Sequence, residues 1–291
     1  MKLEPECIGC IFNQVLKAFR FLKPDVSRDE IITVQKKLME EILKFDKKSN
    51  VTHYLGKTAY GIISEFLKDE DPYRIIKKRN NKLALKFYDD VKKKIENANN
   101  PLFEAIIASA IGNTIDLASQ HEIDLVSDIE NFNQNTLIIN DYSLFKESLK
   151  NANHLLIIGD NAGEIVFDKL LISIIIKFYP DLEVIYSVRS APIINDATME
   201  DAKSINLTKI VQVVKSGAFP GIDIDLSPEI FKQHFYKKGG VILTKGQGNF
   251  ESLYDTQIPN KDVYYLLKVK CNLLERIFNA KIGDLIFQKK T

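Results

Sequence analysis

Apolar side chains recur at spacings of three and four positions between Ile8 and Leu125, as on one face of an α-helix. This pattern is interrupted at Pro24, Pro72 and Pro101, where proline restricts the preceding residue and can occupy the first turn of a new helix. The pattern predicts a helical domain over residues 1–128. Examples of the spacing are Ile11, Val15, Ala18, Phe19 and Leu22, then Val91 and Ile95, and the run 103–115.

The pattern changes after residue 128, where short β-branched runs end in polar or glycine-containing turns and amphipathic segments follow. The predicted strands are Thr136–Ile139, Leu155–Ile158, Val184–Val188, Ile210–Val214, Val241–Leu243 and Val263–Val269. The predicted helices lie near Leu144–Leu149, Gly163–Phe178, Ala197–Ser204, Pro228–Lys237 and Phe250–Tyr254. This alternation predicts an α/β fold, a Rossmann-like, mainly parallel sheet with helices on both faces, over residues 129–291. In such a sheet the loops leaving the carboxyl ends of the strands converge on one crevice, so most of the active site is expected there.

The loop after the second predicted strand reads GDNAGE at 159–164. Its small residues allow a tight turn, and Asp160 and Asn161 present oxygen atoms that can bind a metal ion. The helix that follows offers amide donors to an anion at its N-terminus. An ordinary helix cap with Asp160 at the N-cap position is the alternative interpretation.

The next strand leads into a second polar loop, which begins at Arg189 and contains Asn195 and Asp196. Asp196 is the natural partner for Asp160, because the loop is long enough to fold back over the strand ends. Arg189 is a candidate substrate-binding residue. Asn195 or Asp196 acting only as a cap of the next helix is the alternative.

A third loop, TKGQGNFE at 244–251, has features of a phosphate-binding segment. Lys245 supplies a compact positive charge, Gly246 and Gly248 allow close approach of the backbone, and Asn249 lies where a helix is predicted to begin. The spacing is not that of a P-loop, so hydrolysis of nucleoside triphosphates is not indicated. A flexible surface turn is the alternative.

Together these motifs resemble the DUF89 family, the damage-control phosphatases. The resemblance extends over nearly the whole chain, and it is closest to the branch with an N-terminal Cys-x-x-Cys. It implies a helical region packed against a Rossmann-like domain, phosphatase activity, and a divalent metal ion held by Asp160, Asn161 and Asp196. The segments that carry it are CIGC at 7–10, GNTID at 112–116, GDNAGE, VRSAPIINDAT at 188–198 and KGQGNFE at 245–251.

The resemblance also suggests roles for individual residues. Two carboxylates and an amide oxygen are hard ligands that suit Mg²⁺, Mn²⁺ or Co²⁺, with Ni²⁺ as a further candidate. Asn113 and Asp116 would share a helix face and could reach the crevice, where Asn113 would contact substrate and Asp116 would orient the attacking water; polar contacts between packed helices are the alternative. Lys245 is expected to position the phosphoryl group. Direct attack by Asp160 through a phosphoaspartate stays open beside attack by water.

The three cysteines form a second candidate metal site. Cys7 and Cys10 are spaced to bind one ion, and Cys271 could join them if the last strand returns beside the N-terminus. Ordinary reduced cysteines or a redox pair are the alternatives.

Composition excludes several classes of protein. The 40 basic and 39 acidic residues nearly cancel and form no strongly basic tract, so a nucleic-acid or membrane-surface partner is not expected. The opening MKLEPECIGC is unlike a signal peptide, and three cysteines suit a reducing cytoplasm better than a disulfide scaffold. The expected partner is a small phosphorylated metabolite, such as a sugar phosphate. A phosphometabolite-binding module without catalysis and a cysteine-ligated metal or redox protein are the competing interpretations.

Overall fold

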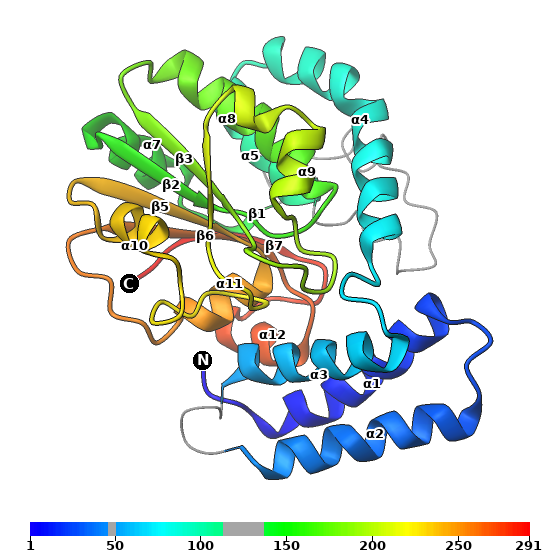
Figure 1. Ribbon diagram of the computed structural model, residues 1–291. Coiled ribbons are helices and arrows are strands. Elements are labelled where there is room, and N and C mark those ends of the chain that lie inside the picture. Colours follow the sequence, from blue (N-terminus) through cyan, green and yellow to red (C-terminus); the bar gives the residue numbers. More distant parts are fainter. Residues whose placement is uncertain (46–50, 113–136) are drawn as a thin grey trace.

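The computed structural model describes residues 1–45, 51–112 and 137–291 (Figure 1). Five long helices come first along the chain: α1 (Pro5–Leu22), α2 (Arg28–Leu43), α3 (Thr52–Leu67), α4 (Arg74–Glu96) and α5 (Pro101–Gly112). None of the helices in the described ranges is both long enough and apolar enough to cross a membrane.

Strands and helices alternate through the rest of the described chain. The strands are β1 (Leu137–Asn140), β2 (His154–Ile158), β3 (Glu183–Val188), β4 (Gln212–Lys215), β5 (Gly240–Lys245), β6 (Asp262–Lys268) and β7 (Leu285–Lys289). The helices are α7 (Tyr142–Asn151), α8 (Glu164–Phe178), α9 (Met199–Ser204), the 3₁₀ helix η2 (Leu207–Lys209), α10 (Glu229–Tyr236), α11 (Gly246–Leu253) and α12 (Asn272–Phe278).

The strands form one sheet in the order β1-β7-β6-β5-β2-β3-β4. Neighbours from β6 to β4 run parallel, whereas β7 is antiparallel to β6 and parallel to β1. The prediction of a mainly parallel sheet is confirmed. The helix α12 and the strand β7 were not predicted; they follow the last predicted strand and add an antiparallel neighbour to β6.

Helices cover both faces of the sheet, as predicted. Along β2 the side chains alternate, so that Leu155 and Ile157 pack with α5, α7 and α8, whereas Leu156 and Ile158 pack with α10, α11 and α12. All four side chains are fully buried. Burial on both faces explains why the strands are almost continuously apolar.

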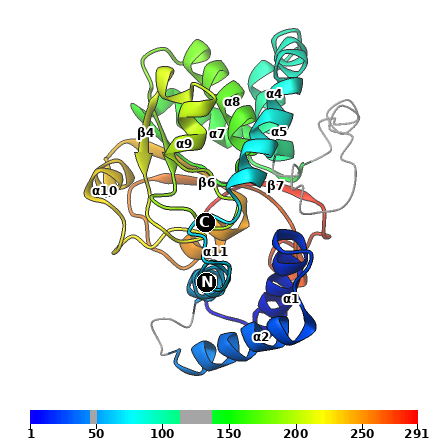
Figure 2. The ribbon, with the colours of Figure 1, turned by 45° about the vertical axis from the view of Figure 1, so that its right-hand side comes forward.

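The helical half of the chain divides between two cores. Helices α1, α2 and α3 surround a separate apolar cluster, which we call the three-helix core. Helix α5 instead packs on α8 as part of the layer over the sheet, and α4 extends along it (Figures 1 and 2). The predicted boundary between residues 128 and 129 lies outside the described residues, and the division at that point stays a prediction.

The three-helix core lies toward the carboxyl ends of the central strands. Helix α3 packs against α11, which begins where β5 ends, and Ile193 from the loop after β3 is buried among the residues of α1 to α3. The opposite edge of the sheet carries the first residues of β2 and β5. The strand ends at which the crevice was predicted therefore face these helices.

A pair of stacked histidines occupies the edge away from this crevice. The rings of His154 and His234 are 5.3 Å apart at 15°, and His154 Nδ1 lies 3.2 Å from Glu183 Oε2. Burial, together with the charges of Lys261 and Lys237, lowers the pKa of His154 to about 4, although Glu183 acts in the opposite direction. His154 is therefore neutral in the folded protein at neutral pH.

This burial predicts an acid-dependent loss of stability. The folded pKa lies below the unfolded value of 6.5, so the unfolded chain binds the extra proton and the free energy of unfolding falls as pH drops from about 6.5 toward 4. Wild type should lose on the order of 1–2 kcal/mol more than His154→Gln between about pH 7 and about pH 5. Urea titrations of both proteins measure this, and equal losses would contradict it.

Candidate functional site

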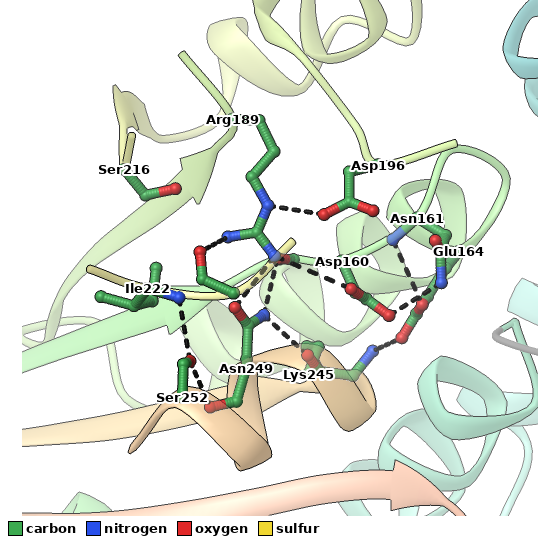
Figure 3. Close-up of polar contacts among 12 residues, drawn as sticks. Asp160, Asn161, Glu164, Arg189, Asp196, Ser216, Ile222, Lys245, Asn249 and Ser252 are labelled. Carbon is green, nitrogen blue, oxygen red and sulfur yellow. Dashed lines mark hydrogen bonds and ion pairs between the residues drawn. The ribbon is translucent and has the colours of Figure 1, made fainter. Parts of the chain in front are cut away.

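The structure brings together the three residues predicted to hold a metal ion (Figure 3). Asn161 and Asp196 pair as an isolated antiparallel β-bridge, and Ala197 N donates to Asp160 O at 2.7 Å. The amide nitrogen of Asn161 also donates to Asp160 Oδ2 at 2.7 Å, so its amide oxygen is the atom that could bind a cation. The two loops are thus joined by backbone hydrogen bonds, which fix both carboxylates at the carboxyl edge of the sheet.

Arg189 is the first residue of the second loop and is almost fully buried. Its Nε donates to Asp196 Oδ2 at 2.6 Å, its Nη1 donates to Gly221 O at 2.9 Å, and its Nη2 donates to Asn249 Oδ1 at 2.9 Å. Nη2 also lies 3.8 Å from Asp160 Oδ1. Arg189 therefore ties together all three predicted motifs, and the substrate-binding role predicted for it stays a prediction.

Lys245 lies on the far side of Asp160, with no exposed surface. Its Nζ donates to Glu164 Oε1 and Asp168 Oδ1, both at 2.6 Å, and to Ser109 O at 3.1 Å. These contacts use the three N–H donors of an ammonium group. In this arrangement Lys245 holds α5 and α8 against the sheet, and its predicted contact with a phosphoryl group stays a prediction.

The segment 245–251 is not a flexible surface turn, because Lys245 ends β5 and Gly246 begins α11. The predicted helix at Phe250 thus starts four residues earlier. Gly246 has φ +77°, and a Cβ there would lie 1.9 Å from Asp160 Oδ2. Asn249 donates to Gly159 O at 3.0 Å and to Lys245 O at 2.7 Å, so its amide supports the turn around Asp160. A Cβ on Gly248 would lie 2.7 Å from Pro220 O.

The buried polar centre contains more acidic than basic side chains. Burial, with the charge of Asp196 as the next cause, raises the pKa of Asp160 to about 6. Burial also raises the pKa of Glu164 to about 7 and raises that of Asp196. If all were ionised, the four carboxylates Asp160, Glu164, Asp168 and Asp196 would exceed the two cations paired with them, Arg189 and Lys245, by two charges. The charges of Lys270 and Lys77 also act on Asp160 and Asp196.

This charge excess fits a divalent cation. Carboxylate and amide oxygens suit a hard ion that keeps part of its water shell, so Asp160, Asn161 and Asp196 have the right donor chemistry. Within the described ranges no group of three or more His, Cys, Asp or Glu side chains is arranged to hold a metal ion. The predicted set has only two such residues, and Asn113 and Asp116 lie outside the described residues.

Several residues of this buried centre were not predicted from the sequence. Glu164 and Asp168 are separated by four positions on α8, and this spacing of two acids on one helix face could have indicated a shared cation. Asn81 accepts from Gly163 N at 2.7 Å, and Lys270 lies where its charge lowers the pKa of Asp160. No local sequence pattern identifies Asn81 or Lys270 as part of the centre, because each lies far along the chain from the residue that it acts on.

The cysteines belong to α1 and to the start of α12, and Cys271 Sγ accepts from Gln247 Nε2 of α11 at 3.5 Å. Cys7 is in the first turn of α1 and Cys271 immediately precedes α12, and the two helices are joined by an ion pair of 2.7 Å between Glu6 and Arg276. Burial raises the pKa of the Cys7 thiol, and the charges of Cys271 and Cys10 raise it further. All three thiols are free, and the second metal site stays a prediction.

Comparisons with known proteins bear on this site. The model of the damage-control phosphatase ARMT1-like domain matches residues 3–286. An uncharacterized protein of Methanocaldococcus jannaschii is 32% identical, covering 100% of this chain and 96% of its own. A damage-control phosphatase of Pyrococcus horikoshii is 32% identical, covering 98% and 97%. The crystal structure of a DUF89 family protein from Pyrococcus horikoshii covers 100% of both chains with a TM-score of 0.84 and 27% identity.

Because a Cβ on Gly246 would collide with the Asp160 carboxylate, adding one methyl group at this position should disturb Asp160 specifically. Gly246→Ala should displace the Asp160 carboxylate and weaken binding of Mn²⁺ by the apoprotein. Gly283→Ala is a matched control, since Gly283 also has a positive φ of +103° but has open space around its missing Cβ.

Both variants should lose about 1 kcal/mol or more of stability from the backbone conformation. Urea titration and calorimetric titration with Mn²⁺ separate the two effects. Equal Mn²⁺ affinity in the two variants would show that Gly246 is required only for its backbone conformation.

Proposed function

The chain belongs to the damage-control phosphatase ARMT1-like domain family, and we propose that it hydrolyses small phosphorylated metabolites, such as sugar phosphates, with the help of a divalent metal ion. Phosphatase activity is supported by the family match and by relatives named damage-control phosphatase. Metal dependence is supported by one observation above all, the joining of Asp160 and Asp196 in a buried centre with excess negative charge.

The proposed ligands are Asp160, Asn161 and Asp196, and the ion is Mg²⁺, Mn²⁺ or Co²⁺, with Ni²⁺ as a further candidate. A divalent ion at this position would withdraw charge from phosphoryl oxygens and increase the acidity of water. Arg189 would hold Asp196 in place through its 2.6 Å hydrogen bond, and Asn249 would hold Arg189. The first turn of α11 would direct amide N–H groups toward the phosphate.

Hydrolysis transfers the phosphoryl group from the ester oxygen to water. A bond forms between the water oxygen and phosphorus, the bond between phosphorus and the ester oxygen breaks, and a proton from water reaches the leaving alcohol. Asp116 is the proposed group that orients the water. The alternative is attack by Asp160 to give a phosphoaspartate that water then cleaves.

Phosphate release from a panel of sugar phosphates tests the proposal. Protein freed of metal by a chelator would be assayed alone and after addition of Mg²⁺, Mn²⁺, Co²⁺ or Ni²⁺. Release that depends on the added ion is expected. Binding of sugar phosphates without release would favour a binding module, and metal-independent release would contradict the proposed role of the ion.

Asp196→Asn should separate metal binding from folding. The asparagine can still accept the hydrogen bond from Arg189 Nε, so the fold should survive, whereas the lost charge should weaken Mn²⁺ binding and slow phosphate release by about 100-fold or more. Glu229→Gln, which removes a carboxylate at the start of α10, is the control. Calorimetry and initial rates on both proteins measure the effect. Full metal-dependent activity in Asp196→Asn would show that Asp196 is not a ligand of the proposed metal site.

Two lysines near Asp160 should behave differently. Lys245→Ala would leave Glu164 and Asp168 buried without their cation, and it should cost about 3–5 kcal/mol of stability. Lys270 has an exposed side chain two residues after the end of β6, and its charge acts on Asp160. Lys270→Ala should therefore cost less stability than Lys245→Ala, and it should raise the KM for a sugar phosphate by about tenfold if its charge meets the phosphoryl group.

Thermal unfolding and initial rates on the two lysine variants measure these effects. A raised KM in a stably folded Lys245→Ala variant, with no change in Lys270→Ala, would support the direct phosphoryl contact predicted for Lys245.

A further inference from the structure

The loop that carries Asp196 is anchored in the three-helix core. Ile193 is only 2% exposed and is a member of that apolar cluster, although it lies on the loop after β3. Ile194 packs against the same cluster. This loop is therefore held by helices that come from the first quarter of the chain.

The backbone at the anchor is strained. Ile194 has φ +47°, a left-handed conformation that β-branched residues rarely adopt. Such a conformation persists only where the surrounding structure imposes it. Here packing of Ile193 and Ile194 against the helices is the contact that can impose it.

The strained residue is connected to the metal-binding segment by a short chain of hydrogen bonds. Asp196 N donates to Ile193 O at 3.0 Å, which closes a tight turn around Ile194. Ala162 N donates to Asn195 O at 2.9 Å. A shift of the anchor would therefore move the backbone of Asp196 and its pairing with Asn161.

The same helical unit also contacts the other support of Asp196. Gly221 O accepts from Arg189, which in turn donates to Asp196. The loop that contains Gly221 is held against α3, because Tyr54 donates to Asp223 Oδ2 at 2.9 Å and a Cβ on Gly56 would lie 2.8 Å from Pro220. Helix α3 thus braces both sides of Asp196.

We propose that Ile193 and Ile194 are positioning residues, through which the three-helix core holds Asp196 in the geometry that binds the metal ion. This inference rests on the proposed metal site. The side chains touch neither substrate nor metal, and they act by fixing the turn at 193–196. Removal of the anchor would let Ile194 relax toward an ordinary backbone conformation and carry Asp196 away from Asn161.

A matched pair of cavity variants tests the inference. Ile193→Ala and Leu38→Ala delete the same number of carbon atoms from the three-helix core, but Leu38 is on α2, which packs on α1 and α3. Both should lower stability in urea. Only Ile193→Ala should weaken Mn²⁺ binding to the apoprotein, by about tenfold or more on calorimetry.

Two further readouts distinguish positioning from general loosening. Hydrogen exchange at the Ala162 and Ala197 amides, which bridge the two loops, should accelerate in Ile193→Ala and not in Leu38→Ala. Ile193→Val, which keeps most of the apolar contact, should restore Mn²⁺ affinity to near the wild-type value.

The possible failures are distinguishable. Wild-type Mn²⁺ affinity in a folded Ile193→Ala variant would overturn the positioning role and leave the proposed metal site intact. Equal weakening in Leu38→Ala would also overturn it, because any cavity in the core would then suffice. Absence of Mn²⁺ binding in the wild type would overturn the proposed metal site and, with it, this inference.

Discussion

Burial of four carboxyl groups with two cationic side chains at the carboxyl edge of the sheet is the constraint on which the rest of the structure depends. Carboxylates out of water are costly unless cations and hydrogen bonds compensate them. Lys245 compensates Glu164 and Asp168, and Arg189 compensates Asp196. Burial, followed by the charge of Asp196, raises the pKa of Asp160 to about 6, so the cations that lower this pKa do not fully offset the cost of burial.

The backbone around these groups is shaped to allow that burial. A glycine at 246 leaves room for the Asp160 carboxylate, and Asn249 satisfies carbonyl groups at the ends of β2 and β5. The parallel sheet contributes by ending β2, β3 and β5 at one edge, so that three loops meet there. Gly246 and Asn249 each make a specific contact with the turn around Asp160, so both belong to one short motif.

The helical half has two tasks in this arrangement. Helix α5 closes the buried centre from one side, since Ser109 donates to Asp168 at 2.6 Å and its carbonyl accepts from Lys245. Helices α1 to α3 instead hold the loops that carry Arg189, Asp196 and Gly221. The buried centre is therefore assembled from both halves of the chain, and both must be folded to form it.

The sequence by itself determined most of the elements and the three polar motifs, because hydrophobic period and short polar motifs are local signals, whereas α12 and β7 were not predicted. The parallel sheet, the helices on both faces and the family were predicted correctly from those signals, and the separate motifs containing Asp160 and Asp196 do meet. Only the tertiary structure decided the partners. Lys245 is bound to Glu164 and Asp168, Arg189 is buried between the loops, and Ile193 reaches the three-helix core. These contacts join residues far apart in the chain, so their energies depend on distances that only the packed fold defines.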